Sequence, residues 1–324
     1  MRAVTLPTPS TSQRAVSRRS LDCWAGRFFF VITLLPIGLT VAITAALVVR
    51  SWPILQSQSL WALLSGTTWK PLQGQFGFLP FIAGTFWVTL AAILLSLPPC
   101  LLTAIYLAEY ARKSMREVVK PLLDLLAAIP SVVYGVWGML AIVPLVEKTI
   151  MPWSARWLEF IPLFRSSNPT GFGVLSGAIV LAVMIAPFII AVTYEVLSTA
   201  SHGIRQASLA VGATRWQTVK YAVLPQALPG IAAGIVLGAS RALGETMAVL
   251  MVVGNVAQVP GSVFDAAYPL PALIANNYGE MMSIPLYDAA LMNAALILLV
   301  IVLVFNVAST LILRRVMGRV RRAW

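Results

Sequence analysis

The sequence predicts an all-α integral membrane protein with six transmembrane helices. Hydrophobic residues make up 59% of the 324 residues and charged residues only 10%, whereas an average soluble domain is roughly 25% charged. The apolar residues form runs of about 20 or more, the length that crosses a hydrocarbon core of roughly 30 Å. Because backbone groups in lipid must satisfy their hydrogen bonds internally, these runs are predicted to be helices. A soluble helical protein would show amphipathic stripes instead.

The six apolar runs can be placed directly on the sequence. They cover residues 28–49, 81–106, 118–146, 172–196, 228–253 and 289–313. Interior prolines at Pro98, Pro99, Pro130 and Pro187 are expected to kink these helices, because neighbouring helices can satisfy the freed carbonyls. The first run is long enough to span and is followed by no convincing small-residue cleavage site, so it is interpreted as a retained helix.

The arginines and lysines predict the orientation. If the N-terminus is cytoplasmic, 17 of the 23 arginines and lysines fall in cytoplasmic segments, which is the bias of the positive-inside rule. The sequence therefore predicts cytoplasmic basic tails at 1–27 and 314–324 and a transmembrane domain at 28–313. Anionic lipid of the bilayer accounts for the net charge of +12, so no nucleic-acid partner is needed.

Two charged residues, Arg241 and Glu245, lie deep in the fifth run. A charge at the bilayer centre costs about 3 kcal/mol on insertion scales, so such residues usually face a protein interior or a water-filled path. Their spacing of four puts them on one face of a continuous helix, where they can pair. In one interpretation Arg241 binds a tetrahedral oxyanion and Glu245 compensates its charge when the site is empty. In the other, the pair only fixes helix packing.

The fifth run also carries a ladder of small residues. Gly230, Gly234 and Gly238 recur every four residues, a pattern that lets two transmembrane helices approach closely. The ladder could form part of a pathway between two subunits or could serve packing within the chain.

The polar segment at about 199–226 is larger than a bare connection between two helices requires. Its residues predict a short helix, a bend at Gly212, a second short helix and a stop at Pro225. At Gly212 we expect a backbone angle that a β-carbon would penalise. A segment of this size suggests a docking element.

At these residues the chain resembles the permeases of bacterial ABC importers. Their cytoplasmic loop has the pattern Glu-Ala-Ala, three residues, Gly, nine residues, Ile, one residue and Leu-Pro. The spacing is intact here, with departures at the first, third and Ile positions, and the matching residues are Gln206, Ala207, Ser208, Gly212, Ala222, Leu224 and Pro225. Three further parts of the chain resemble the PstC-type permease family of the phosphate-specific importer: residues 106–110, residues 125–138, and residues 241–248 followed by Gly254 and Asn255.

The resemblance implies a type I ABC importer permease in the bacterial inner membrane that imports inorganic phosphate. It implies a path formed with a PstA-like permease, two copies of a PstB-like ATPase subunit inside and a phosphate-binding protein outside. Arg241 and Glu245 would contact substrate. The contact with the ATPase would involve Gln206, Ala207, Ser208, Gly212, Leu224 and Pro225.

Other functions predict other features. An ABC permease for sulfate or molybdate remains an alternative on the sequence. An ion-coupled secondary transporter would need intramembrane carboxylates, and Glu245 is the only deeply placed candidate. The chain has no Gly-x-x-x-x-Gly-Lys-Ser/Thr phosphate loop and no clustered catalytic or metal-ligand residues. We therefore expect a transport subunit rather than an enzyme, with no cofactor or metal, and with ATP hydrolysis supplied by its partners.

Overall fold

The computed structural model describes residues 11–165, 168–200, 202–280, 284 and 286–320. The chain divides into two compact units, residues 1–50 and residues 51–324. Helix α1 (Thr11–Ser57) contains the first predicted span but begins well before it. The predicted basic tail at 1–27 is thus helical from Thr11 onward, while residues 1–10 and the last four residues of the C-terminal tail lie outside the described residues.

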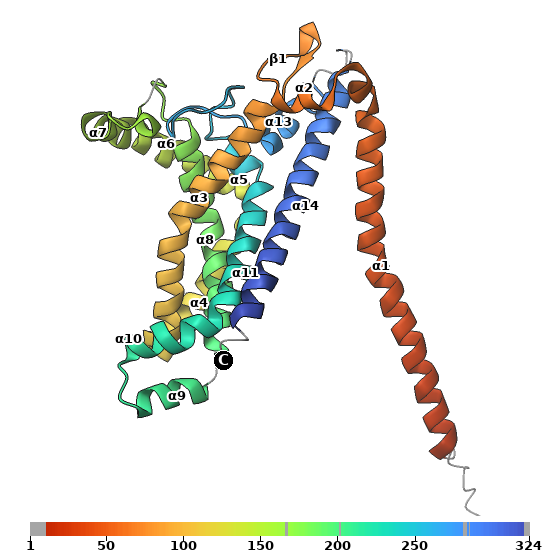
Figure 1. Ribbon diagram of the computed structural model, residues 1–324, viewed down its shortest axis with the longest axis vertical. Helices are drawn as coiled ribbons and strands as arrows, with labels where there is room; N and C mark the ends of the chain where they lie inside the picture. Colours follow the sequence, from red (N-terminus) through yellow and green to blue (C-terminus); the bar gives the residue numbers. More distant parts are fainter. Residues whose placement is uncertain (1–10, 166–167, 201, 281–283, 285, 321–324) are drawn as a thin grey trace, which may run out of the picture. The chain divides into compact units, whose positions relative to one another are not determined.

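The second unit is a bundle of long apolar helices (Figure 1). Helix α3 (Leu79–Ile105) packs along α8 (Val174–Ser198). Helix α11 (Leu224–Leu243) packs against α8 and against α14 (Tyr287–Val320). Both α3 and α8 run through their interior prolines without ending. Among the described residues, six helical segments are long and apolar enough to cross a membrane, as predicted: 24–57, 79–110, 131–157, 174–198, 215–243 and 287–315.

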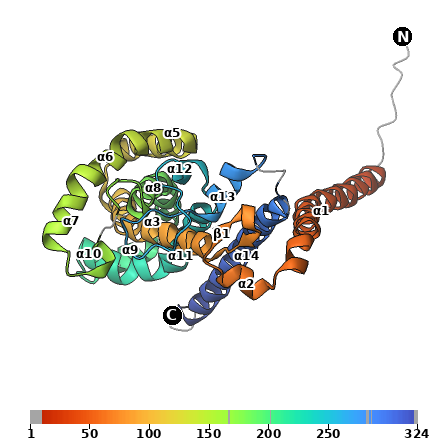
Figure 2. The same ribbon diagram turned by 90° about the horizontal axis from the view of Figure 1, so that it is seen from above.

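The third predicted run, 118–146, is not one helix. Helix α4 (Lys113–Ala128) ends before Ile129 and Pro130, whose backbones are extended, and α5 (Ser131–Trp137) begins after them. The prediction that Pro130 only kinks this helix is wrong, because the residue before a proline disfavours the helical conformation. The chain then continues through the π-helical turns η3 (Gly138–Ile142) and η4 (Val146–Ile150), with α6 (Val143–Leu145) between them, to α7 (Met151–Trp157). Seen from above, α5, α6 and α7 form an arc beside α3 and α8 (Figure 2).

The fifth predicted run, 228–253, is also broken. Helix α11 ends at Leu243, and a short helix α12 (Met247–Leu250) follows after three residues. Another short helix, α13 (Leu270–Asn277), comes before α14. The prediction of one helix through residue 253 is therefore wrong.

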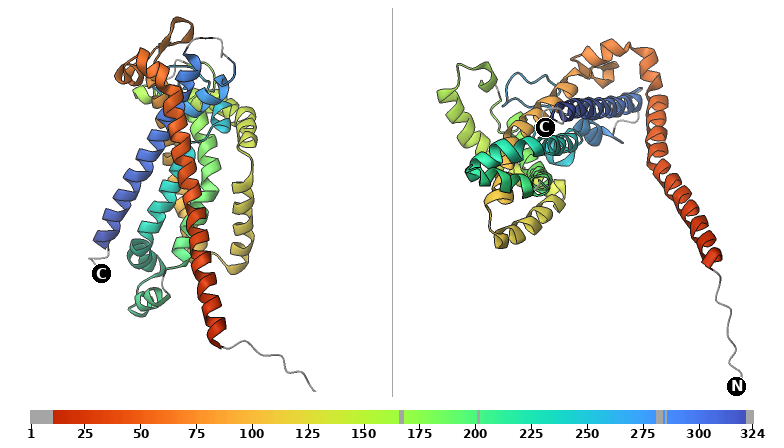
Figure 3. Two further views of the ribbon diagram at one scale, coloured as in Figure 1. Left: turned by 90° about the vertical axis from the view of Figure 1, so that its right-hand side faces the viewer. Right: turned by 60° about the horizontal axis from the view of Figure 1, so that its bottom comes forward.

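The two ends of the bundle carry different structures, as the views in Figure 3 show. One end holds α2 (Leu60–Ser65) and an antiparallel hairpin of β1 (Trp69–Lys70) and β2 (Gln75–Phe76), joined by the 3-10 turn η1 (Pro71–Gln73). The ring of Trp69 packs there against a cluster of aromatic rings: Phe76, Phe78, Phe81 and Tyr287. The other end holds the short helices α9 (His202–Ala210) and α10 (Arg215–Thr218).

Three more short turns complete the described elements. The π-helical turn η2 (Tyr106–Tyr110) extends α3, and η6 (Val219–Val223) joins α10 to α11. The 3-10 turn η5 (Pro162–Phe164) follows α7. Both η2 and η6 lie at the end of the bundle that carries α9. At this end, α3 and α11 therefore continue as π-helical turns.

Candidate functional site

Arg241 lies in the last turn of α11. Its side chain is exposed, and it makes no hydrogen bond or ion pair with the residues that the structure describes. Its neighbour Ser240 ties α11 to α14, because its hydroxyl lies 2.8 Å from Oδ1 of Asn306 and 2.9 Å from the Val236 carbonyl. Arg241 is thus held on a helix that is anchored to α14.

Glu245 lies beyond the end of that helix. Since α11 ends at Leu243, Glu245 falls in the connection to α12, where its Oε1 accepts a hydrogen bond from the backbone N–H of Ala248 (3.2 Å). The described residues form three ion pairs, and Arg241 with Glu245 is not among them. The pairing predicted from the spacing of four is therefore wrong for this conformation, because it requires a helix that continues to Glu245.

A small cavity lies on the inner side of Glu245. The side chain is partly buried and lines a cavity of about 10 Å³ together with Thr85 and Thr89 of α3. A cavity of this size holds roughly one water molecule. The guanidinium of Arg241 is the more exposed of the two charged groups.

The glycine ladder lies against α8. A β-carbon on Gly230 would stand 2.5 Å from Val196, and one on Gly238 would stand 2.8 Å from Ile189. Separations below 3 Å are not found for real β-carbons, so only glycine permits this approach of the two helices. The ladder thus serves packing within the chain, and the face of α11 that carries it is already covered.

The segment predicted to dock has the geometry of a helix hairpin. Gly212 adopts the predicted left-handed backbone, with φ at +86°. Its N–H donates to the Leu209 carbonyl (3.0 Å) and the N–H of Ala213 to the Ser208 carbonyl (3.2 Å), which together form a Schellman motif that ends α9. Thr214 and Gln217 then form a capping box that starts α10.

Pro225 does not stop the second helix of this hairpin, so that prediction is wrong. Helix α10 continues through η6 into α11, and Pro225 falls in the first turn of α11. A proline lacks the N–H that an α-helix would use at this position, and a π-helical turn just before it changes the hydrogen-bond pattern so that the helix can continue. Helix α10 is therefore continuous with α11 in one helical segment, 215–243, that is long and apolar enough to cross a membrane.

Much of the hairpin is accessible. Gln206, Ala207 and Gly212 are exposed, and the apolar side chains of Val211 and Trp216 are 84% and 51% exposed. Ser208 and Thr218 join the two arms through their hydroxyls, 3.0 Å apart. Exposed apolar side chains on an ordered hairpin are typical of a surface that a partner protein covers.

Arg205, in this hairpin, was not predicted from the sequence to be a site residue. Arg205 forms a mostly buried ion pair with Glu109, at 2.7 Å. Arg205 directly precedes Gln206, and Glu109 lies in the segment 106–110, so both belong to parts of the chain that resemble the permease family. However, 96 positions separate them, and no local spacing brings them together.

Comparison with known proteins decides the family. The model of the binding-protein-dependent transport system inner membrane component matches residues 101–322. The chain belongs to this family. A phosphate transport system permease protein PstC of Pasteurella multocida is 35% identical over 293 residues, covering 90% of each chain. A probable ABC transporter permease protein, YqgH of Bacillus subtilis, is 36% identical and covers 91% of this chain and 93% of its own. The predicted resemblance to the PstC-type permeases is confirmed.

The solved structures agree on the fold. A bacterial ABC transporter involved in the import of the acidic polysaccharide alginate has a chain that is 17% identical, with a TM-score of 0.56 over 94% of this chain and 99% of that one. As a binding-protein-dependent inner membrane component, this protein is a multi-pass transport component of the plasma membrane with the fold of an ABC importer permease. Members of the family work with an ATPase and a binding protein.

Proposed function

We propose that this protein is the PstC-type permease subunit of an importer of inorganic phosphate. In this assignment it forms the translocation path with a PstA-like permease, two copies of a PstB-like ATPase subunit hydrolyse ATP, and an extracytoplasmic binding protein delivers phosphate. The relatives named as phosphate transport permeases, which cover about nine tenths of the chain, support this cargo.

The exposed Arg241 carries the proposal. A guanidinium within a membrane-spanning segment must face water or protein, because lipid cannot solvate it. Its fork of donors suits the oxygens of a phosphate, which it can bind in pairs. The side chain is exposed on the single chain and has no anionic partner among the described residues. It therefore fits one wall of a path whose other wall belongs to a second permease.

The α9–α10 end is the proposed cytoplasmic face. Basic residues gather there on three segments that meet the bundle at this end: Lys113, Arg116, Lys120, Arg205, Arg215 and Lys220. This distribution follows the positive-inside rule. Residues 28–313 then form the transmembrane domain and residues 199–226 its coupling segment. The hairpin meets the ATPase subunit through exposed residues that include Gln206, Ala207 and Gly212.

The test is uptake of radiolabelled phosphate by the complete complex in proteoliposomes that enclose ATP, with the binding protein outside. We expect uptake that needs ATP and that excess sulfate or molybdate does not reduce. Uptake of sulfate or molybdate in place of phosphate would instead support a permease for that oxyanion. Uptake without ATP that collapses with a proton or sodium gradient would overturn the assignment and favour a secondary transporter.

A further inference from the structure

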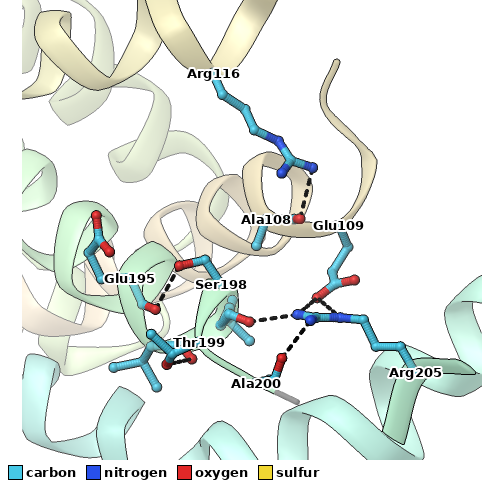
Figure 4. Close-up of polar contacts among 10 residues, drawn as sticks. Ala108, Glu109, Arg116, Glu195, Ser198, Thr199, Ala200 and Arg205 are labelled. Atoms are coloured by element: carbon cyan, nitrogen blue, oxygen red, sulfur yellow. Dashed lines mark hydrogen bonds and ion pairs between the residues drawn. The ribbon is translucent and has the colours of Figure 1, made fainter. Parts of the chain in front are cut away.

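One side chain, Arg205, makes the hydrogen bonds that join α9 to the neighbouring ends of two membrane helices among the described residues. Its Nη2 and Nε donate to Oε1 of Glu109 at 2.7 and 3.2 Å (Figure 4). The side chains of Arg205 and Glu109 are only 16% and 12% exposed. Glu109 lies in η2, the turn that extends α3. The pair therefore links α9 directly to the end of a membrane helix.

The same guanidinium also binds the end of a second membrane helix. Its Nη1 donates to the carbonyl of Ala200, and its Nη2 to that of Leu197, each at 2.7 Å. These carbonyls lie at and just beyond the C-terminus of α8, and that of Leu197 also accepts the backbone N–H of Ala200 at 3.3 Å. The planar fork of an arginine spreads five donors over three nitrogens, whereas a lysine carries three donors on one nitrogen, so a lysine could keep only some of these contacts.

A second arginine holds the same end of η2 from the other side. Arg116 of α4 donates to the carbonyl of Ala108 at 2.9 Å (Figure 4) and to that of Ala111 at 3.1 Å. The segments η2, α4, α8 and α9 thus meet around one cluster of charge-assisted hydrogen bonds. Among the described residues, the side-chain hydrogen bonds from α9 to α8 and η2 all come from Arg205.

The rest of α9 packs mainly on its own hairpin. Its neighbours are α10 and η6, and its outer residues are exposed. Without Arg205, a force on α9 would therefore reach the bundle only through the chain itself, at the short connection from α8 and the continuous helix from α10 to α11, and through the packing of α9 on η6. With Arg205 in place, the same force also reaches the ends of α3 and α8.

We propose that Arg205 and Glu109 are positioning residues that pass movement of α9 to α3 and α8, and so couple ATP hydrolysis to transport. This inference rests on the proposed function, in which α9 meets the ATPase subunit. For this role, the ion pair between Arg205 and Glu109 must stay intact while α9 moves. A buried ion pair meets this requirement better than an exposed one, because removing one partner leaves the other charge buried and uncompensated.

The structure offers a matched control. Lys120 of α4 and Glu195 of α8 form an ion pair near the same end, but their side chains are 57% and 53% exposed. The hydrogen bond with Glu195 raises the pKa of Lys120. Exposed pairs of this kind contribute little, so Lys120→Gln removes a charge at the same end of the bundle without breaking the link to α9.

The experiment compares Glu109→Gln, Arg205→Gln, Arg205→Lys and Lys120→Gln in the reconstituted complex, measuring phosphate uptake per ATP hydrolysed. We expect a severalfold fall in this ratio for Glu109→Gln and Arg205→Gln, a smaller fall for Arg205→Lys and no change for Lys120→Gln. A wild-type ratio in Glu109→Gln and Arg205→Gln would overturn the inference. Failure of the wild-type complex to take up phosphate would instead contradict the proposed function.

A second measurement does not depend on the cargo or on full assembly. A spin label on Val211, in a variant without Cys23 and Cys100, reports how firmly the hairpin is held. We expect the label to become more mobile in Arg205→Gln and Glu109→Gln but not in Lys120→Gln. Unchanged mobility in the first two variants would show that Arg205 does not fasten α9.

Discussion

Gly234 of α11 lies so close to Val192 of α8 that a β-carbon on the glycine would stand 2.8 Å from Cγ1 of the valine. The two helices cross here without space between them. Gly230 and Gly238 make the same kind of approach one turn before and one turn after. In lipid, where apolar side chains gain little by leaving the solvent, this close packing is a main source of helix association.

We therefore predict that Gly234→Val destabilises the protein. Overpacking of a tight contact typically costs about 1–3 kcal/mol, and the branched Val192 cannot turn away as a flexible side chain would. Thermal unfolding of the detergent-solubilised protein would show a lower midpoint. Adding Val192→Ala should recover part of the loss. Gly261→Ala is the control, because its nearest neighbour would be Oδ2 of Asp265 at 3.7 Å. Equal losses in the two glycine variants would contradict the packing argument.

Removal of the charge of Arg241 should abolish phosphate uptake. In Arg241→Gln the side chain keeps much of its length but loses its charge and its fork of donors, so a bound phosphate is no longer compensated. Because Arg241 makes no ion pair with the described residues, its loss leaves no buried carboxylate behind, and the complex should reach the membrane at normal levels. Uptake and an immunoblot of membranes measure the two effects. Uptake at the wild-type rate would remove Arg241 from the path.

The structure makes a distinct prediction for Glu245. Its carboxylate binds the N–H of Ala248 rather than Arg241, and Gln can keep that hydrogen bond through its amide oxygen. The effects of Arg241→Gln and Glu245→Gln on the free energy of unfolding should therefore add to within about 0.5 kcal/mol. A double-mutant cycle measures the coupling between them. A larger coupling energy would show that the two residues pair after all in the state being measured.

The sequence predicted the membrane spans well because their signal is local. A run of apolar residues reports on transfer into lipid, and α3 and α8 begin and end within about two residues of the predicted runs. The same signal cannot show where a helix breaks inside the protein. The breaks before Ser131 and after Leu243 lie within apolar sequence, so the apolar signal continues through them.

The candidate site was predictable in its residues but not in its contacts. Gly212 was identified because one residue type decides one backbone angle. The contact between Glu109 and Arg205 depends on how η2 and α9 meet at one end of the bundle, although the two residues are 96 positions apart in the sequence. The pairing of Arg241 with Glu245 was wrong for a related reason, since a spacing of four predicts a contact only where the helix continues.

The last prediction concerns Gly212 and the ATPase contact. A β-carbon at Gly212 meets no atom within 4 Å, so a substitution acts only through the backbone angle, φ +86°. Holding an alanine in this conformation costs about 1–2 kcal/mol. The hairpin turn at Gly74 offers a matched control, since its φ is +68° and a β-carbon there is equally free of contacts. Both Gly212→Ala and Gly74→Ala should lower stability by similar amounts, but only Gly212→Ala should reduce the stimulation of ATP hydrolysis by the loaded binding protein.

Crosslinking locates the contact that this effect requires. Single cysteines at positions 206–220, in a variant without Cys23 and Cys100, would be tested against cysteines on the ATPase subunit. We expect crosslinks to concentrate near Gly212, where Val211 is 84% exposed, and to weaken when Gly212→Ala is added, because the Schellman motif that aims α9 is then strained. Crosslinks that map instead to α4, near Lys113, would show that another segment meets the ATPase. A loss of stimulation in Gly74→Ala as large as in Gly212→Ala would show that general destabilisation, and not the bend of the hairpin, causes the uncoupling.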